Sequence, residues 1–509
     1  MSQSQPDPRL NERRDAQAKA RADDHVQAAS RERAEVPSAL RRTFADLGQA
    51  LQASHRPDEF LCAWVQAEAS DYVRLNQGRL RQAGSVHRQQ ATLRLIQGAR
   101  QSSLTITLSD DPGRSMAEQI RPALESLRAV LIDSEDDPLL DVCRDAVVSE
   151  DVGPGLSSSG RASGSVAAVL AQDAGVSAQV GLDPLIDVLS VRDAQGDLVA
   201  FIAAGRLGRG FCSSSGASQW FERHSIAVDG SIHLPVDPLT GDRRAVKFGW
   251  SGETADPDAL SEAVARARLE AGLLQRPAKR LSPGDYRVLL RPRALADLLG
   301  MLDWGGYSAR AHLSGQSPLA RLRAGQQTFS PLLHLAEDLS AGLAPAFQTD
   351  GYARPPRTEL IRAGQFADWL VSPSTAREFG IAGNSAPPSE VPESVVVGCG
   401  RLSDDDALAR LGTGVLLSNL WYLNFSDREA CRVTGMTRFA CLWVEDGEPV
   451  APIEAMRFDD SLYRVLGESG LEALGDRAHR MPNLDTWEGR ATGGILAPSA
   501  LVRALRFAL

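Results

Sequence analysis

Residues 411–448 read LGTGVLLSNLWYLNFSDREACRVTGMTRFACLWVEDGE, and no other segment of the sequence holds as much information about its architecture. The part up to residue 423 is apolar with small polar interruptions, and residues 424–432 are polar and turn-forming. Residues 439–444 are apolar and aromatic, and the turn Asp446-Gly447 follows them. This alternation predicts two buried strands on either side of a polar segment.

Two charged residues lie next to these apolar runs. Asp427 follows the first strand pattern, and Arg438 directly precedes the second. A charge that is brought near a core needs a partner or a ligand to offset its desolvation. A simple surface hairpin would not need these charges there, so the segment is a candidate functional site.

The same segment carries a family resemblance. Residues 419–427 (NLWYLNFSD) and 431–439 (CRVTGMTRF) resemble the C-terminal part of the TldD/PmbA proteins. The resemblance extends to EASDYVRLN at 68–76, YRVLLRPRA at 286–294 and MRFDDSLY at 456–463. It therefore covers most of the sequence from about residue 55 onward.

This resemblance implies one of two branches, a zinc-bearing TldD branch or a metal-free PmbA/TldE branch, which together form a cytoplasmic peptidase. In the zinc-bearing branch a helix carries His-Glu-x-x-x-His, whose imidazoles bind zinc while the glutamate activates the metal-bound water. The matching segment here, residues 294–302, reads ALADLLGML, and the sequence has no His-Glu dipeptide. The zinc-bearing branch also uses a cysteine near its C-terminus, whereas the last cysteine here is Cys441. The resemblance thus implies a TldE-like protein without metal or cofactor, whose TldD-like partner holds the zinc.

Two other arrangements of reactive residues are open as alternatives. His334 and Glu337 have the i, i+3 spacing that lets both side chains face one metal on a helix, and His312 is a further histidine in this part of the sequence. A solvated or capping histidine is the commoner explanation, since no third ligand is near in sequence. Cys399 lies between glycines and is a candidate nucleophile, but no His/Asn or His/Asp context distinguishes it from a buried structural thiol.

The candidate residues for binding a substrate or partner are Trp421, Tyr422, Asn424, Asp427 and Arg438. In the functional interpretation, this segment reaches into a cleft shared with the partner. The arginine and the amide would there hold the carboxylate or backbone carbonyls of a peptide. An extended peptide would add to an exposed sheet edge through main-chain hydrogen bonds.

A purely structural interpretation of the same residues is also open. The two aromatic side chains would then fill the core, and Asn424 would close a turn. Arg438 would pair with Asp427, or with one of the aspartates at 459 and 460. The two interpretations differ in where they place the guanidinium group, which is either in a buried ion pair or at a strand end beside a cleft.

Composition limits the class of protein. The 509 residues carry a formal net charge of -10 and are 43% hydrophobic, which is typical of an acidic globular protein and argues against non-specific nucleic-acid binding. The six cysteines include no CxxC pair, as expected in a reducing compartment. No apolar run approaches the roughly 20 residues that a membrane span needs. We expect a cytoplasmic protein that binds neither nucleic acid nor membrane.

The pattern along the sequence predicts an α+β fold. We expect a mobile or disordered segment at 1–36, then an N-terminal domain at 37–280 in which helices pack on an antiparallel sheet. Its low-complexity stretch at 153–165, GPGLSSSGRASGS, is expected to be a flexible loop. A β-rich C-terminal domain is expected at 281–509. Helical patterns occupy residues 116–132 and 257–274.

Further elements follow from the same periodicities. A third helical pattern lies around residues 138–147, and a strand pair is predicted at 198–204 and 210–220. The Gly-x-Gly of the second strand is not a dinucleotide-binding motif, because no helix with an acidic residue about 20 positions later follows it.

We therefore predict a non-catalytic TldE-like subunit of a heterodimeric zinc metallopeptidase that acts on unfolded or modified peptides. The subunit would form part of the substrate cleft, and its partner would supply the catalytic zinc. One alternative is a catalytically silent homodimer that binds peptides without cutting them. A less favoured alternative is a hydrolase with an atypical site.

Overall fold

The computed structural model describes residues 38–109, 113–152, 182–191, 196–236, 238, 241, 243–487 and 489–508. The predicted mobile segment at 1–36 and the predicted loop at 153–165 lie outside these residues. The described part combines helices with three sheets, so the predicted α+β class is confirmed. We refer to residues 38–274 as the N-terminal region and to residues 284–508 as the C-terminal region.

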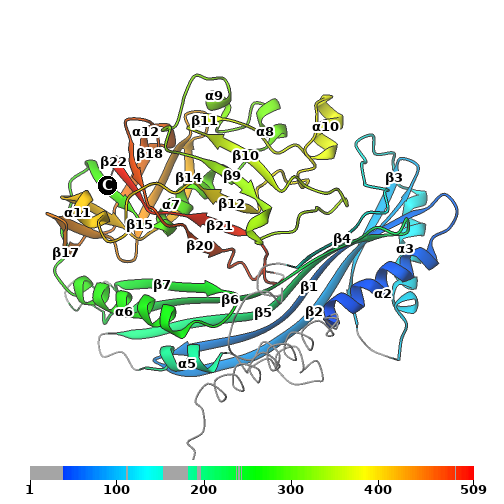
Figure 1. Ribbon diagram of the computed structural model, residues 1–509, viewed down its shortest axis with the longest axis horizontal. Coiled ribbons are helices and arrows are strands. Elements are labelled where there is room, and N and C mark those ends of the chain that lie inside the picture. The colour runs from blue at the N-terminus through cyan, green and yellow to red at the C-terminus, as the bar shows by residue number, and fades with distance from the viewer. Residues whose placement is uncertain are drawn as a thin grey trace, which may run out of the picture.

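The N-terminal region is built on one seven-stranded sheet in the order β3-β2-β1-β5-β6-β4, with β7 also pairing with β6. Its strands are β1 (Phe60–Asn76), β2 (Arg79–Gln97), β3 (Arg100–Leu108), β4 (Val148–Val152), β5 (Asp197–Ser213), β6 (Ser218–His233) and β7 (Ala245–Gly252). All its pairings are antiparallel except that of β4 with β6. Figure 1 shows the long strands as a curved layer beneath the C-terminal region.

Helices cover this sheet at its two ends (Figure 1). The elements are α2 (Ala39–Ser54) and α3 (Met116–Ile132) at one end, and α5 (Asp183–Leu189) and α6 (Pro257–Leu274) at the other. Leu47 and Leu124 pack with Leu93 of β2 in one core, while Leu260 of α6 packs with Ile202 of β5 in another. The amphipathic spacing that predicted helices at 116–132 and 257–274 is therefore confirmed, because one stripe of each helix is buried.

The C-terminal region contains two sheets. The nine-stranded sheet has the order β14-β15-β18-β22-β8-β13-β16-β17, with β19 on β22, and the six-stranded sheet has the order β11-β10-β9-β12-β21-β20. The first consists of β8 (Gly284–Leu290), β13 (Gly414–Leu417), β14 (Asn419–Asp427), β15 (Arg432–Arg438), β16 (Leu442–Glu445), β17 (Glu448–Pro452), β18 (Arg457–Ser461), β19 (Leu471–Leu474) and β22 (Ala500–Phe507). The second consists of β9 (Leu335–Asp338), β10 (Arg357–Arg362), β11 (Gln365–Phe366), β12 (Ser394–Val397), β20 (His479–Pro482) and β21 (Gly494–Ala497).

Short helices lie in the connections between these strands. They are α7 (Pro292–Leu299), continued by the 3-10 turn η2 (Gly300–Asp303), α8 (Ala309–Leu313), α9 (Ala320–Arg323), η3 (Leu339–Ala341), α10 (Pro373–Phe379), α11 (Ala407–Leu411) and α12 (Leu462–Val465). Pro292 opens α7 at its first position, where a missing N–H costs no hydrogen bond. Among the described residues, no helix is long and apolar enough to cross a membrane.

Two predictions about secondary structure are wrong. Residues 138–147 form no helix, because this segment is held by contacts with distant residues, such as the 2.9 Å hydrogen bond from the Cys143 N–H to the Asp350 carbonyl. The predicted break between strands near residue 205 is also absent, since β5 continues through Gly205. A Cβ at Gly205 would lie 2.1 Å from the Ala69 carbonyl oxygen, so glycine permits close strand approach there instead of a turn.

The segment 411–448 is more divided than its sequence indicated. Ser418 separates β13 from β14, and β16 begins only at Leu442, because Phe439 has a positive φ of 62°. The first strand is buried, whereas much of the second is exposed. The single buried strand expected before the polar segment is thus two strands with different environments.

Candidate functional site

The β14–β15 hairpin forms one edge of the nine-stranded sheet (Figure 1). Its two strands pair with an irregularity between Trp421 and Asn424, where Tyr422 adopts a positive φ of 52°. An extra residue in one strand of a pair bends that strand and redirects its side chains. The irregularity therefore explains how two consecutive aromatic side chains both reach the surface.

Trp421 and Tyr422 are 46% and 77% exposed, so the interpretation in which they fill the core is wrong. Their ring centroids lie 5.4 Å apart. The guanidinium group of Arg438 lies 5.4 Å from the centroid of the Trp421 ring and 5.1 Å from that of Phe439. Met436, opposite Trp421 on β15, is 37% exposed. We call these five side chains the Trp421–Arg438 surface.

The ion pairs proposed for Arg438 in the structural interpretation are absent from the described residues. Asp459 pairs instead with Arg432 at 2.5 Å, and Asp460 pairs with Arg464. Arg438 is exposed and makes its side-chain contacts with aromatic rings. It does emerge at a strand end, as the functional interpretation expected, because β15 ends at Arg438.

The structure separates the other two predicted residues from this surface. Asn424 pairs with Thr434 in the middle of the hairpin and is exposed. Asp427 lies at the hairpin turn, where its Oδ1 accepts the N–H of Ala430 at 3.0 Å. Its local role is therefore that of a turn-closing residue, and the five predicted residues do not form a single cluster.

The Trp421–Arg438 surface extends to the N-terminal sheet. Lys247 of β7 places its Nζ 5.8 Å from the Phe439 ring centroid, and the same amine pairs with Asp229 of β6 at 2.7 Å. Nearby on β6, the pKa of His233 is lowered, first by partial burial and then by positive charges that include Arg438. The exposed end of β15 thus lies close to Lys247 of β7 and His233 of β6.

Helix α7 supports the edge strand from behind. Its Asp297 accepts the N–H of Leu420 in β14 at 3.2 Å and the Nε–H of Arg293 at 2.9 Å. Burial raises the pKa of Asp297 despite these contacts. The helix leucines at 295, 298 and 299 and Leu302 of η2 are at most 2% exposed and belong to the main core of the C-terminal region.

The alternative metal and nucleophile candidates are placed elsewhere. His334 and Glu337 do not share a helix, since β9 begins after His334, and Glu337 pairs at 2.5 Å with the buried Arg354. His312 donates its Nε2–H to the Gly306 carbonyl at 2.9 Å, and burial lowers its pKa to about 4. Within the ranges that the structure describes, no three His, Cys, Asp or Glu side chains are grouped so that they could hold a metal.

Cys399 is exposed but lacks the features of an activated thiol. Its pKa is raised, first by desolvation and then by the negative charge of Asp476. A nucleophilic cysteine needs a lowered pKa from a nearby cation, histidine or helix N-terminus. The site around Cys399 has the opposite electrostatics.

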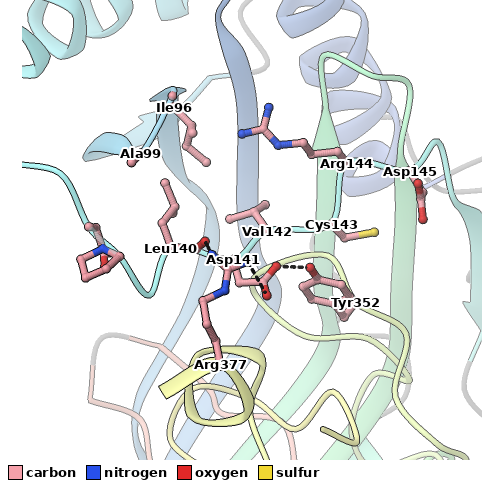
Figure 2. A pocket seen from close by; sticks show the side chains of 13 residues that line it. Ile96, Ala99, Leu140, Asp141, Val142, Cys143, Arg144, Asp145, Tyr352 and Arg377 are labelled. Atoms are coloured by element: carbon pink, nitrogen blue, oxygen red, sulfur yellow. Dashed lines mark hydrogen bonds and ion pairs between the residues drawn. The ribbon is translucent and has the colours of Figure 1, made fainter. Parts of the chain in front are cut away.

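A cavity of about 550 Å³ lies between the segment 137–145 and the C-terminal region. Figure 2 shows Asp141 at its centre, where the carboxylate accepts hydrogen bonds from Tyr352 and from Arg377. Burial and Asp141 raise the pKa of the Tyr352 hydroxyl, so this group stays protonated. Because both of its oxygens are engaged, Asp141 joins the segment 137–145 to Tyr352 and to Arg377 of α10.

Comparison with known proteins adds two kinds of similarity. Residues 283–509 match the model of the PmbA/TldA metallopeptidase C-terminal domain. Among solved structures, TldE from Thermococcus kodakarensis aligns with a TM-score of 0.69 and 14% sequence identity, over 92% of this chain and 100% of that chain. No curated protein sequence matches this one.

Two further structures share the fold. A putative modulator of a DNA gyrase from Thermotoga maritima aligns with a TM-score of 0.65 and 15% identity, over 91% of this chain and all of that one. A putative modulator of DNA gyrase from Bacteroides thetaiotaomicron aligns with a TM-score of 0.68 and 13% identity, over 92% of this chain and 98% of that one. At these identities the alignments establish a common fold across both regions.

Proposed function

We propose that this chain, whose residues 283–509 match the PmbA/TldA metallopeptidase C-terminal domain, is a TldE-like, non-catalytic subunit of a zinc metallopeptidase. A TldD-like partner would carry the zinc, and the two subunits would enclose a cleft for unfolded or modified peptides. The observation that carries this proposal is the composition and burial of helix α7.

Helix α7 follows strand β8, and the resemblance described above places the metal ligands of the zinc-bearing branch on this helix. Zinc needs nitrogen, sulfur or oxygen donors, and a catalytic zinc needs an open position for water. This helix instead presents Leu295, Leu298 and Leu299 to a closed core. Its one carboxylate, Asp297, is already engaged by Leu420 and Arg293. These features support a scaffolding role for the helix.

The Trp421–Arg438 surface supports the proposed contact with a partner or peptide. Tryptophan, tyrosine, methionine and arginine are enriched at protein interfaces, where aromatic side chains bury a large area at low entropic cost. Strand β14 is an edge strand, and an unpaired strand edge can accept an extended peptide through main-chain hydrogen bonds. In this proposal the exposed aromatic side chains give affinity, and Arg438 orients a carboxylate or carbonyl group.

Reconstitution with a zinc-bearing homologue tests the proposal. We expect the isolated protein to contain no stoichiometric zinc after dialysis and to leave unfolded casein intact. The mixed sample should form a one-to-one complex by light scattering, contain about one zinc per pair and cleave casein. Substituting the partner's metal-binding histidines should remove both the zinc and the cleavage.

Two results would contradict the proposal. One is an isolated protein that retains about one zinc and loses it when His312 or His334 is replaced by alanine. The other is a homodimer that binds casein peptides without cleavage and does not associate with the zinc-bearing homologue. The second result would favour the silent peptide-binding alternative.

A further inference from the structure

Three arginines are buried where the C-terminal region covers strands β5 and β6. Arg209, Arg223 and Arg490 are 8%, 4% and 7% exposed. Within the described part of the protein none of them forms an ion pair with an acidic side chain. Arg209 donates instead to the carbonyls of Gly208 and Arg490, at 2.8 and 3.0 Å.

Arg223 and Arg490 converge on one hydroxyl. Both guanidinium groups donate to Ser225 Oγ at 3.1 Å. Arg490 also donates to Ser70 Oγ at 3.2 Å, and Arg223 reaches the Leu343 carbonyl at 3.4 Å. The Nε–H of Arg223 is buried without a hydrogen-bond partner. The guanidinium groups of Arg223 and Arg490 therefore donate to neutral hydroxyl and carbonyl groups, and they share one of these acceptors, the Ser225 hydroxyl.

This arrangement is costly without a counter-ion. Desolvation, assisted by the positive charges of Arg480 and Arg490, lowers the pKa of Arg223 to about 10. Desolvation also lowers the pKa of Arg490, although Glu68 acts in the opposite direction. A buried charge is normally retained only where it is paired or where it binds a ligand.

The two arginines line a cavity of about 130 Å³. Phe201, Ala203 and Ala227 of the sheet give it apolar lining, and Pro482 and Leu484 of the loop before Arg490 add to it. The cavity therefore combines two buried cations with a partly apolar lining, which also includes the polar side chains of Asn483 and Thr486. This size suits a small planar anion on a short aliphatic chain.

The acidic groups of the lining do not cancel this charge. Asp229 is paired with Lys247 at 2.7 Å. Asp485 lies in an exposed turn, where its Oδ1 accepts the N–H of Trp487 at 2.8 Å. Two acids outside the lining act on the arginines, Glu68 on Arg490 and Glu253 on Arg223. Glu68 accepts the backbone N–H of Arg490 at 3.0 Å and the hydroxyl of Tyr72 at 2.5 Å, and Glu253 is paired with Arg480 at 3.2 Å.

We propose that this cavity, which we call the Arg223–Arg490 pocket, binds a carboxylate carried by a short aliphatic group. Two guanidinium forks and the Ser225 hydroxyl match the planar geometry of a carboxylate, which accepts paired N–H bonds from arginine. The carboxylate belongs either to the free C-terminus of a peptide or to an acidic side chain. The pocket lies within one subunit, so this inference does not depend on the proposed partner or its zinc.

Calorimetric titration of the full-length protein tests the inference with three probes. These are acetyl-Ala-Ala with a free carboxylate, the same dipeptide as its C-terminal amide, and acetyl-Ala-Glu-amide. We expect the free acid to bind and the dialanine amide to give no heat. Binding of the glutamyl amide as well would show that the pocket also accepts acidic side chains, and its failure would restrict the pocket to the free C-termini of peptides.

Variants locate the binding in the pocket. Arg223→Gln should weaken the affinity for acetyl-Ala-Ala at least tenfold, because it removes one guanidinium group. Ser225→Ala should weaken it about threefold. The matched control is Arg206→Gln, which removes an arginine of the neighbouring strand β5 that pairs with Glu222 at 3.4 Å outside the cavity. The control should leave the affinity unchanged within twofold.

The melting temperature of the ligand-free Arg223→Gln variant shows whether Arg223 serves binding or holds the fold together. Because Arg223→Gln removes an uncompensated buried charge, its melting temperature should equal or exceed that of the parent protein. The inference is overturned if neither carboxylate probe binds at 10 mM, or if acid and amide bind equally well.

Discussion

Arg438 lies over the ring of Trp421, with 5.4 Å between the guanidinium carbon and the ring centroid, and both side chains are exposed. A cation over the face of an indole ring is attracted by the ring's quadrupole, by about 0.5–1 kcal/mol at exposed sites. The contact therefore orients the arginine without neutralising it. An oriented and uncompensated charge beside a large exposed aromatic ring is suited to binding a second molecule.

Replacing Arg438 should affect binding more than folding. We expect Arg438→Ala to lower the free energy of unfolding by less than about 1 kcal/mol, because no buried carboxylate is left unpaired. The same change should weaken partner-dependent peptide cleavage by about tenfold or more, since a hydrogen bond to a charged group is worth about 1.5–3 kcal/mol. Urea melts and cleavage assays on the reconstituted pair measure the two effects.

Arg280→Ala is the control for this prediction, because that side chain is 87% exposed and lies outside the Trp421–Arg438 surface. It should change neither quantity measurably. A strongly destabilised Arg438→Ala variant whose folded fraction still cleaves normally would contradict the binding role.

Replacing Arg354, in contrast to Arg438, should reduce the stability of the folded protein strongly. Its side chain is 1% exposed and pairs with Glu337 at 2.5 Å and also with Glu393. Removing one member of a buried pair leaves an uncompensated charge and costs about 3–5 kcal/mol. We therefore expect Arg354→Ala to lose this much stability in urea melts. The double variant Arg354→Met, Glu337→Met should recover most of the lost stability, which would confirm that the unpaired charge is the cause. A loss below about 1 kcal/mol for Arg354→Ala would contradict the structural role of this ion pair.

Asp303 should make stability depend on pH. Burial raises the pKa of its carboxyl from the ordinary value of 3.8 to about 7, so the folded state binds this proton more tightly than the unfolded state. The stabilisation is full below about pH 4 and is lost as the pH rises towards 7. The free energy of unfolding should fall by up to about 4 kcal/mol across this interval.

Asp303→Asn should remove this part of the pH dependence of the free energy of unfolding, since an amide does not titrate. The variant should match the parent protein at pH 4 and exceed it in stability at pH 8, as measured by urea melts across this range. Asp136→Asn is the control, because that carboxylate is 79% exposed. Parallel stability curves for Asp303→Asn and the parent protein would show that the carboxyl titrates normally.

Gly205 should tolerate no side chain. It has a φ of 150°, and a Cβ would lie 2.1 Å from the Ala69 carbonyl oxygen on the neighbouring strand. We expect Gly205→Ala to cost at least about 2 kcal/mol in thermal or urea unfolding, through overpacking and backbone strain. Gly84→Ala in β2 is the matched control, because a Cβ there meets nothing within 4 Å. Equal stability of the two variants would contradict the close approach of β1 and β5.

Local pattern was sufficient for the elements whose signal lies in consecutive residues. The apolar stripe of Leu260, Val264 and Ala271 predicted helix α6, because a period of 3.6 residues places these side chains on one face. The predicted turn at Asp446-Gly447 is present, and its two residues have positive φ values of 50° and 85°, a conformation that favours glycine. The leucines of α7 excluded a His-Glu-x-x-x-His helix by residue identity alone, whatever the surrounding fold.

Tertiary structure alone decided which charges meet. The sequence offered Asp427, Asp459 or Asp460 as partners of Arg438, and the pairing of β15 with β18 instead placed Arg432 beside Asp459. The exposure of Trp421 was equally hidden, since a strand pattern does not say which face another layer covers. Residues 138–147 likewise carry a helical pattern that contacts with distant residues override.

The Arg223–Arg490 pocket shows the same division most clearly. Nothing in the sequence connects Arg223, on a strand, with Arg490, in a loop 267 positions later. Both arginines become buried only when the C-terminal region packs on β5 and β6. Periodicity is a property of neighbouring residues, so the sequence determined helices such as α6, the turn at Asp446-Gly447 and the absence of a His-Glu dipeptide. Burial and charge pairing depend on which distant surfaces meet, and for this protein only the folded structure determined them.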